Sequence, residues 1–330
     1  MKKDFWKGRN VFITGGTGLL GYWITKYLVG AGAQITVLVH RGVPEVFDET
    51  FSKVNVVKGD ITDYEKILSV LRNNKIETVF HLAAQTISPI ANKNPIPTFK
   101  TNIEGTWVVL EACRNTQGIG RIVVASSDKA YGEEEVLPFT EKARLNGIRP
   151  YTVSKSCADL IATAYQKTYD MPICITRCGN FYGGGDLLIE RLVPSAIKAA
   201  MNGEELVIRS DGKFVRDFFY VEDGALATIL LAESMDKKEI WGEDFNFSYE
   251  KPIAVIDFVN IFFNKIGSVK KPKVLNEPLN EIREQYLSCE KARKMLLWTP
   301  TFSFEEGIEK TVLWYKDFFA KSGVSDKKGA

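Results

Sequence analysis

Hydrophobic positions in the first half of the chain follow two alternating patterns. Short apolar runs of strand length occupy residues 11–14, 35–39, 54–57, 78–82, 121–125 and 173–177. The intervening segments 19–28, 63–72, 102–115 and 151–169 have the three-to-four-residue spacing of one-sided helices. Strands that alternate with helices in this way predict right-handed crossovers and a doubly wound α/β fold, with a parallel sheet covered on both faces. Ligands of such folds bind at the carboxyl ends of the strands.

The pattern changes after Asn180. Residues 181–186 are rich in glycine, 209–214 resemble a turn between strands, and helical spacing recurs at 192–201, 223–234, 256–266 and 304–319. We therefore expect residues 1–180 to form the doubly wound domain and residues 181–330 a smaller mixed α/β substrate lobe. Elements near 215–250 are expected to return to the first domain. The polar segment 321–330 is expected to fray.

Composition narrows the class of protein further. The chain has 330 residues, 25% of them charged, and a net charge of +2, which gives no sign of a nucleic-acid surface. No apolar run is long enough for a signal peptide or a membrane span. The odd number of cysteines, five, and their lack of a metal-like pattern predict reduced thiols, a cytoplasmic location and no bound metal.

A glycine motif follows the first predicted strand and opens the first predicted helix. In GGTGLLG, Gly15 permits a tight turn, Gly18 lets the backbone approach a pyrophosphate, and Gly21 allows close helix–strand packing. This context predicts a Rossmann-type site for NAD or NADP. Further cofactor contacts are expected from Thr17, Leu19, Leu20, Asp60, Ile61, Leu82, Ala83 and Ala84. The adjacent His81 is expected to be a packed strand-end histidine rather than a catalyst.

The end of the second predicted strand bears on the choice of dinucleotide. Enzymes that bind the ribose hydroxyls of NAD usually have a carboxylate there, whereas this chain has His40 and Arg41. Arg41 is suited to the 2′-phosphate of NADP, or it is a solvated loop residue. The sequence thus favours NADP slightly and leaves NAD open. Asp60 either accepts a hydrogen bond from the adenine amino group or caps the next turn.

Tyr151 and Lys155 lie four residues apart in a predicted helix and so share one face. A tyrosine with a pKa of about 10 is a poor base at neutral pH, and an adjacent ammonium favours the phenolate. The pair can therefore take a proton from a substrate hydroxyl while a hydride leaves to the cofactor. The same spacing arises by chance in many helices, but its place after the fifth strand predicts a catalytic pair.

More polar residues follow the fifth predicted strand. Ser127 is placed to hydrogen-bond the same substrate oxygen as Tyr151, and Asp128 and Lys129 would supply an acid and a base. The alternative is a capped, exposed turn. Arginine pairs strongly with phosphate. The candidate diphosphate anchors are therefore Arg177, Asn180, Arg216 and Arg283, among which Arg216 stands in a nearly apolar run and Arg283 is the weakest.

These residues together resemble the extended short-chain dehydrogenase/reductase family over nearly the whole chain. The stretches that carry the resemblance include SSDKAYG, YTVSKSCADL and RCGNFYGGGDLLIERLVP, and they are most similar to nucleotide-sugar 4,6-dehydratases of the CDP-glucose type. The resemblance adds Asn102 to the cofactor contacts, and Gln85 and Arg191 to the substrate contacts. It also implies a homodimer in which the helices at 102–115 and 151–169 pair across a two-fold axis.

The resemblance further implies a reaction on a nucleotide-diphosphate hexose in deoxysugar biosynthesis. Tyr151, assisted by Lys155 and Ser127, would be the base during oxidation at C4. Asp128 would be the acid as water leaves C6, before the hydride returns to that carbon. Lys129 stands where dTDP-glucose relatives have the glutamate that removes the C5 proton.

Two other functions remain open. A nucleotide-sugar epimerase would use the same Tyr151, Lys155 and cofactor but would need no acid at Asp128. A non-catalytic cofactor-binding or regulatory protein is disfavoured because the glycine motif, Tyr151 and Lys155 are all intact. The resemblance identifies neither the sugar nor the nucleotide base.

Overall fold

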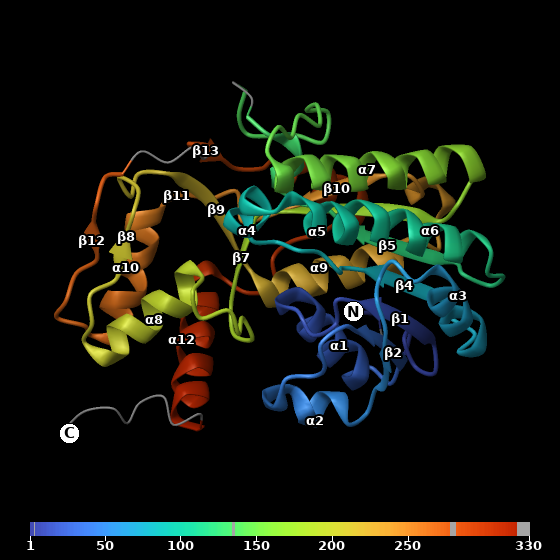
Figure 1. Cartoon of the computed structure of the whole chain (residues 1–330), viewed down its shortest axis with the longest axis horizontal. Helices are drawn as coiled ribbons and strands as arrows, with labels where there is room; N and C mark the ends of the chain where they lie inside the picture. Colours follow the sequence, from blue (N-terminus) through green and yellow to red (C-terminus); the bar gives the residue numbers. More distant parts are fainter. Residues whose placement is uncertain (3, 134–135, 278–281, 322–330) are drawn as a thin grey trace.

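The computed structural model describes residues 1–2, 4–133, 136–277 and 282–321. Among these residues, a central sheet of seven strands, all parallel, has the order β10-β6-β5-β4-β1-β2-β3 (Figure 1). Its strands are β1 (Asn10–Thr14), β2 (Gln34–Val39), β3 (Asn55–Lys58), β4 (Thr78–His81), β5 (Arg121–Ala125), β6 (Ile173–Cys178) and β10 (Asp244–Phe247). The six strands expected from the apolar runs are confirmed, and β10 joins the edge beside β6.

Helices cover both faces of this sheet, as the alternating pattern predicts. One layer contains α1 (Leu19–Gly30), α9 (Val221–Ser234) and α11 (Glu290–Leu296), and the other contains α3 (Tyr64–Asn73), α6 (Gly105–Arg114) and α7 (Pro150–Tyr169). Successive side chains of β1 alternate between the two layers. Val11 and Ile13 enter one core and Phe12 enters the other, and all three are fully buried. The doubly wound α/β prediction is therefore confirmed.

The remaining elements form a smaller assembly beside the central sheet (Figure 1). Its sheet has the order β11-β9-β13, with β7 also paired to β9 and a separate β12-β8 pair. These strands are β7 (Asn180–Tyr182), β8 (Val207–Ile208), β9 (Val215–Tyr220), β11 (Pro252–Ala254), β12 (Lys273–Val274) and β13 (Glu284–Gln285). The helices are α8 (Leu192–Asn202), α10 (Val255–Ile266) and α12 (Phe304–Lys321). They pack on an aromatic cluster in which Phe218 and Phe258 stack with ring centroids 3.6 Å apart.

Short helical segments connect the larger elements. They are η1 (Glu45–Phe47), α2 (Asp48–Phe51), α4 (Ser88–Lys93), α5 (Pro95–Phe99), η2 (Lys100–Glu104), η3 (Asp128–Tyr131) and η4 (Lys238–Ile240). The helix expected at residues 102–115 differs in its first turn, because η2 is a π-helix and α6 follows it. Asn102 lies in this π-turn and makes two hydrogen bonds with the backbone of Gln85. The Gln85 N–H donates to Asn102 Oδ1 (2.7 Å), and the Gln85 carbonyl accepts from Asn102 Nδ2 (2.9 Å).

Candidate functional site

The glycine motif forms a tight turn between β1 and α1. Gly15 has a φ of +71°, and a Cβ there would lie 2.7 Å from the amide nitrogen of Ala83. The Gly18 N–H donates to the Gly15 carbonyl at 3.0 Å, and a Cβ at Gly21 would overlap that same oxygen. Helix α1 then begins with no side-chain cap and no acidic residue in its first turn. Its N-terminus is therefore suited to a pyrophosphate, so these residues fit NAD(P).

The end of β4 lies against this turn and brings further predicted cofactor contacts together. The Leu82 and Ala83 N–H groups both donate to Thr14 Oγ1 at 3.2 Å, and Ala84 and Gln85 follow in the chain. His81 is buried, and its ring nitrogens lie 2.9 Å from Thr14 Oγ1 and 3.0 Å from Thr106 Oγ1. Burial lowers the pKa of His81 to about 3, which keeps the ring neutral. The prediction of a packed histidine is confirmed.

The ends of β2 and β3 place three of the predicted polar contacts side by side. His40 and Arg41 are exposed, and His40 Nε2 lies 3.6 Å from Asp60 Oδ2. Asp60 accepts hydrogen bonds from the backbone N–H and hydroxyl of Thr62, at 2.9 and 2.7 Å, and these bonds lower its pKa. Asp60 therefore stabilises its own turn, and it remains exposed on the side of His40. Ile61 is buried, where it would collide with a Cβ at Gly105.

Tyr151 and Lys155 lie in α7 and are both buried. Lys155 Nζ donates to the Ala125 carbonyl at 2.8 Å, which fixes the ammonium at the end of β5. Burial lowers the pKa of Lys155 to about 8. Burial and the charge of Asp128 raise the pKa of Tyr151 to about 12, against the opposing effects of a hydrogen bond with Ser127 and the charge of Arg191. The expected lowering of the phenol pKa is thus not produced by the chain's own groups, because desolvation and the Asp128 charge outweigh the Ser127 hydrogen bond and the Arg191 charge.

Asp128 and Lys129 form an ion pair at the start of η3. Ser127 caps this turn by accepting a hydrogen bond from the Lys129 N–H at 3.3 Å, but Asp128 is only 1% exposed, so the alternative is correct for the cap and wrong for the exposure. Ser127 Oγ donates to Asp128 Oδ1 at 2.9 Å, and Lys129 Nζ donates to Asp128 Oδ2 and Asn180 Oδ1, both at 3.0 Å. The structure therefore brings Ser127, Asp128, Lys129 and Tyr151 together at the carboxyl end of β5. A hydroxyl, a carboxyl, an amine and a phenol in one cluster, with the carboxyl and the phenol buried, can move protons to and from a bound substrate.

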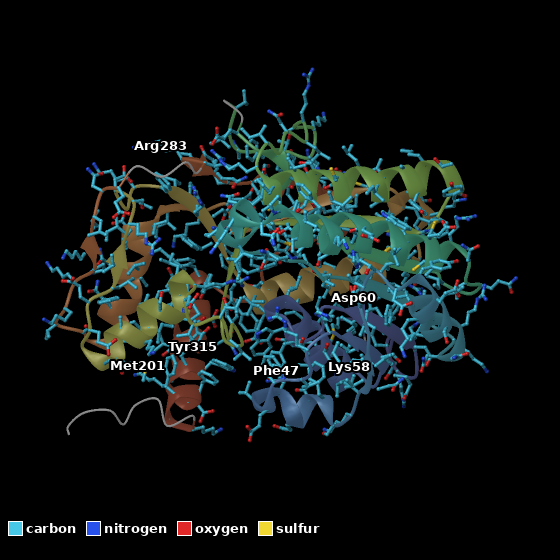
Figure 2. The ribbon with its side chains drawn as sticks, viewed as in Figure 1. Phe47, Lys58, Asp60, Met201, Arg283 and Tyr315 are labelled. Carbon is cyan, nitrogen blue, oxygen red and sulfur yellow. The ribbon has the colours of Figure 1, made fainter. Side chains whose placement is uncertain are left out.

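The candidate arginine anchors separate into different environments. Arg191 bonds to Asp186 at 3.3 Å and to Thr86 Oγ1, and its positive charge opposes the rise in the pKa of Tyr151. Arg216 is buried, and its Nη1 donates to the carbonyls of Val215 (2.8 Å) and Arg283 (3.2 Å). The Arg283 side chain is exposed at the outer edge of the small sheet, 3.6 Å from Asp211 (Figure 2).

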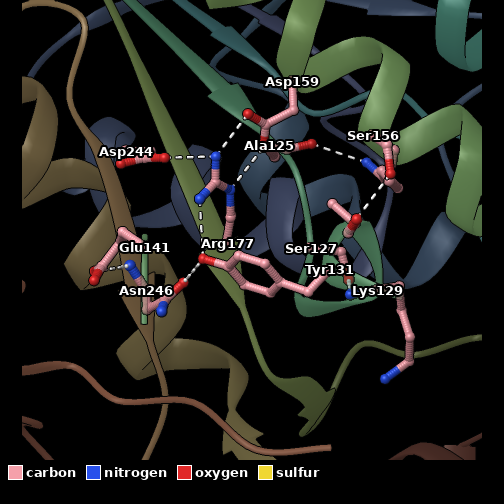
Figure 3. A network of polar contacts seen from close by, with 12 residues as sticks. Ala125, Ser127, Lys129, Tyr131, Glu141, Ser156, Asp159, Arg177, Asp244 and Asn246 are labelled. Carbon is pink, nitrogen blue, oxygen red and sulfur yellow. Dashed lines mark hydrogen bonds and ion pairs between the residues drawn. The ribbon is translucent and has the colours of Figure 1, made fainter. Parts of the chain in front are cut away.

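Arg177 is not a diphosphate anchor, which corrects the prediction. Its guanidinium is almost completely buried and forms a two-pronged ion pair with Asp159, with both nitrogen–oxygen distances 2.8 Å (Figure 3). It also lies 2.5 Å from Asp244 Oδ2 and donates to the Tyr131 hydroxyl at 2.9 Å. The Tyr131 hydroxyl in turn donates to Asn246 Oδ1 at 2.7 Å. Arg177 thereby connects the segment after Lys129 to α7, β6 and β10.

Replacing Arg177 by methionine is expected to lower the free energy of unfolding by about 3–5 kcal/mol, because the buried Asp159 carboxylate and the partly exposed Asp244 carboxylate would lose their common partner. Lys238→Met, which breaks an exposed pair with Asp170, is the matched control and should change stability little. Urea denaturation measures both effects. Equal midpoints for the two variants would show that the Arg177 network does not stabilise the fold.

Two general features complete the description of the site. No group of three or more histidine, cysteine, aspartate or glutamate side chains in the described part of the chain is arranged to hold a metal ion. None of the described helices combines the length and the apolar character needed to cross a membrane. The cysteines Cys113, Cys157, Cys174, Cys178 and Cys289 all lie in described segments and are free thiols.

Sequence motifs did not point to Gln285, which contacts both members of the Asp128–Lys129 pair. It reaches them because β13 pairs with β9, and β13 is a two-residue strand without a recognisable pattern. No local signal in the sequence would have placed Gln285 at the site.

Comparison with known proteins matches this arrangement to one family. The model of the NAD dependent epimerase/dehydratase family matches residues 11–247. A CDP-glucose 4,6-dehydratase of Salmonella typhimurium is 30% identical over 335 residues, covering 95% of this chain and 92% of that protein.

Solved structures agree in fold over almost the same length. A UDP-glucose 4-epimerase of Thermotoga maritima with UDP-glucose has a TM-score of 0.87 and 28% identity, covering 94% of this chain and 99% of that one. A dTDP-glucose 4,6-dehydratase of Bacillus anthracis in complex with NAD has a TM-score of 0.84 and 27% identity, with 94% and 97% covered. Because the family match spans most of the chain and includes the glycine turn, Tyr151 and Lys155, this protein belongs to the NAD dependent epimerase/dehydratase family of extended short-chain dehydrogenase/reductase enzymes.

Proposed function

We propose that this enzyme is a nucleotide-sugar 4,6-dehydratase that converts an NDP-hexose to the NDP-4-keto-6-deoxyhexose, with CDP-glucose as the first substrate to test. The observation that carries the proposal is the ion pair of the buried Asp128 with the partly exposed Lys129, beside Ser127 and Tyr151. A buried carboxyl is costly to desolvate, and an elimination reaction needs both an acid and a base. The similarity to the Salmonella CDP-glucose dehydratase supports the same substrate class.

Each proposed residue has one task in the reaction. Tyr151 takes the proton from the C4 hydroxyl, which Ser127 helps to orient, while the buried Lys155 ammonium favours the phenolate. Transfer of a proton from the Lys129 ammonium to the Asp128 carboxylate makes Lys129 a free amine and Asp128 an acid. Lys129 then takes the proton from C5, and Asp128 protonates the C6 hydroxyl as it leaves. Bound NAD(P)+ would accept the C4 hydride and supply it to C6. C5 regains its proton from Lys129, and the O4 proton held by Tyr151 then passes to the Asp128–Lys129 pair and restores it, so one water leaves for each sugar converted.

The substrate's nucleotide and diphosphate need separate contacts. We assign these to Gln85, Asn180, Arg191 and Arg216, with Arg283 at the rim. The cofactor is assigned to the glycine turn together with Thr17, Leu19, Leu20, Leu82, Ala83, Ala84, Asn102, His40, Arg41, Asp60 and Ile61. In this assignment residues 1–180 bind mainly the cofactor and residues 181–330 mainly the nucleotide sugar. The free cysteines support a reducing, cytoplasmic setting.

Product analysis with a panel of nucleotide hexoses tests the proposal directly. Dehydration lowers the mass of the product by one water, whereas epimerisation leaves the mass unchanged and alters the stereochemistry. The similarity to the Thermotoga epimerase makes epimerisation the second candidate. An epimer of unchanged mass as the sole product would replace the dehydratase assignment.

We propose a modest preference for NADP over NAD, because Arg41 is exposed where the adenine ribose would lie and no carboxylate follows β2. Arg41→Ala is expected to weaken NADP binding and to leave NAD binding nearly unchanged. Titration of wild type and variant with each dinucleotide measures the four dissociation constants. Lys53→Ala, at an exposed lysine outside these contacts, is the control. Tighter binding of NAD than NADP by the wild type would refute the preference.

We also propose a homodimer built on α6 and α7, which pack side by side (Figure 1). Trp107 and Leu160 are 42% and 57% exposed on these helices, which is high for large apolar side chains. Val108 and Leu110, which also lie on α6, belong to the core of the monomer. Light scattering is expected to show a dimer at micromolar concentration and Leu160→Glu to shift it to monomer. A monomeric wild type would rule the dimer out.

A further inference from the structure

Gln285 lies in the small sheet, far from the acid/base pair in the sequence. Its strand β13 runs parallel to β9, in register with Arg216. The side chain is completely buried. A buried carboxamide needs partners for both its oxygen and its nitrogen. The partners of Gln285 are therefore informative about its role.

Both partners are in the Asp128–Lys129 pair. Gln285 Nε2 donates to the backbone carbonyl of Asp128 at 2.7 Å, and Gln285 Oε1 accepts from Lys129 Nζ. This amide orientation is required by chemistry, because a carbonyl only accepts and an ammonium only donates. A rotation of the amide by half a turn would lose both bonds. The backbone of Asp128 thus orients Gln285, and Gln285 orients the amine of Lys129.

The amine of Lys129 is held from three separate segments. Its acceptors include Asp128 Oδ2 in the same turn, Asn180 Oδ1 in β7 and Gln285 Oε1 in β13. Three oxygens match the three N–H donors of an ammonium, and transfer of one of these protons to Asp128 leaves the free amine that a base requires. Two of these acceptors are neutral amides, which direct the amine without adding a further negative charge. A base that must lose its proton during turnover needs this combination of fixed direction and limited negative charge.

We propose that Gln285 is a positioning residue that aims Lys129 at the C5 proton and thereby controls the elimination step without affecting oxidation at C4. The inference rests on the proposed dehydratase function, since only that reaction removes the C5 proton. Tyr151 and Lys155 are held by α7 and the end of β5, and Gln285 makes no hydrogen bond to either of them in the structure. Loss of Gln285 should therefore separate the two chemical steps.

The test compares Gln285→Met with Glu284→Met, an identical replacement of the exposed neighbour in the same strand. Both holoenzymes are mixed with CDP-glucose, and two readouts are followed. Oxidation at C4 is measured in a single turnover by the near-ultraviolet absorbance of reduced nicotinamide. Removal of the C5 proton is measured in D2O by mass spectrometry of the recovered sugar. Gln285→Met is expected to slow C5 exchange on the order of 10²-fold and to leave C4 oxidation within about twofold. Glu284→Met should match the wild type in both readouts.

A second variant tests the importance of a neutral acceptor. Gln285→Glu places a carboxylate beside the Lys129 amine and favours its ammonium form. The pH at which C5 exchange is half-maximal should therefore rise by about 1–3 units, while the profile of C4 oxidation stays in place. If Gln285 had a purely structural role, the pH profile of C5 exchange would not shift relative to the pH profile of C4 oxidation. Thermal unfolding of each variant confirms that the compared proteins are folded.

The outcomes separate the inference from the function on which it rests. If wild type yields no dehydrated product from any nucleotide hexose, the proposed function fails and the role of Gln285 fails with it. If wild type dehydrates its substrate while Gln285→Met exchanges C5 at the wild-type rate, the positioning role alone is overturned. Equal slowing of both steps, or unchanged profiles in Gln285→Glu, would also overturn it.

Discussion

Replacing Tyr151 by phenylalanine is expected to lower the rate of nucleotide-sugar dehydration by about 10²–10⁴-fold, because the proton of the C4 hydroxyl would lose its acceptor. The change removes a single oxygen and leaves the ring to fill the same buried space. Cofactor binding and stability should therefore change little. Steady-state rates and a cofactor titration measure the two effects. Tyr169→Phe, at the exposed end of the same helix, is the matched control.

The pH dependence of C4 oxidation provides a second test of this pair. Burial lowers the pKa of Lys155 to about 8, so its ammonium is present at neutral pH and is lost as the pH rises through that value. Its help to the Tyr151 phenolate should fade over the same range. Lys155→Met should remove this pH dependence and slow C4 oxidation at neutral pH.

An activity of Tyr151→Phe equal to wild type would exclude Tyr151 as the base.

Replacing Lys129 by methionine is expected to slow dehydration by about 10²–10⁴-fold while oxidation at C4 continues, so that reduced cofactor accumulates on the enzyme. The fate of isotopic labels in the wild-type reaction should match this separation of C4 oxidation from C5 proton removal. Dehydration in D2O places solvent deuterium at C5, whereas a deuterium introduced at C4 of the substrate is recovered at C6. Mass spectrometry and proton NMR of the product locate both labels. Lys142→Met, at an exposed lysine, is the control.

Asp128→Asn removes the proposed acid with almost no change in shape and should also retain C4 oxidation. Because its carboxylate raises the pKa of Tyr151, the amide should shift the pH profile of oxidation toward lower pH. This shift distinguishes Asp128 from Lys129. Wild-type turnover by both Asp128→Asn and Lys129→Met would remove the dehydratase assignment and favour the epimerase.

The parts of the fold that were predicted from the sequence are those whose pattern is local. The apolar runs of β1 and β2 are buried on both faces, so their hydrophobicity alone marks them as strands of a covered parallel sheet. The π-turn at Lys100–Glu104 was not predicted, because it depends on the bonds that Asn102 makes to Gln85 and Ser154. A tertiary contact of that kind leaves no periodic signal in the sequence.

The same distinction holds within the candidate site. Tyr151 and Lys155 are one helical turn apart, so their spacing alone brings them together. Arg177 was predicted to bind a diphosphate because arginine pairs strongly with phosphate. In the structure, Asp159 in α7 and Asp244 in β10 compensate the charge of Arg177, which lies in β6. Gln285 was missed for a related reason, since its partners lie more than a hundred residues away.

Strand β10 pairs with β6 but lies far behind it in the chain, and this order has a consequence for synthesis of the protein on the ribosome. Strand β6 is buried along its whole length, yet its outer neighbour, Asp244–Phe247, and the covering helix α9 are translated only after β7, α8 and β9. Until then the nascent chain presents an apolar strand edge, the type of surface that pairs with other chains. Ribosome profiling of chaperone-bound nascent chains should therefore find chaperone engagement that begins once β6 has emerged and ends once β10 has left the exit tunnel.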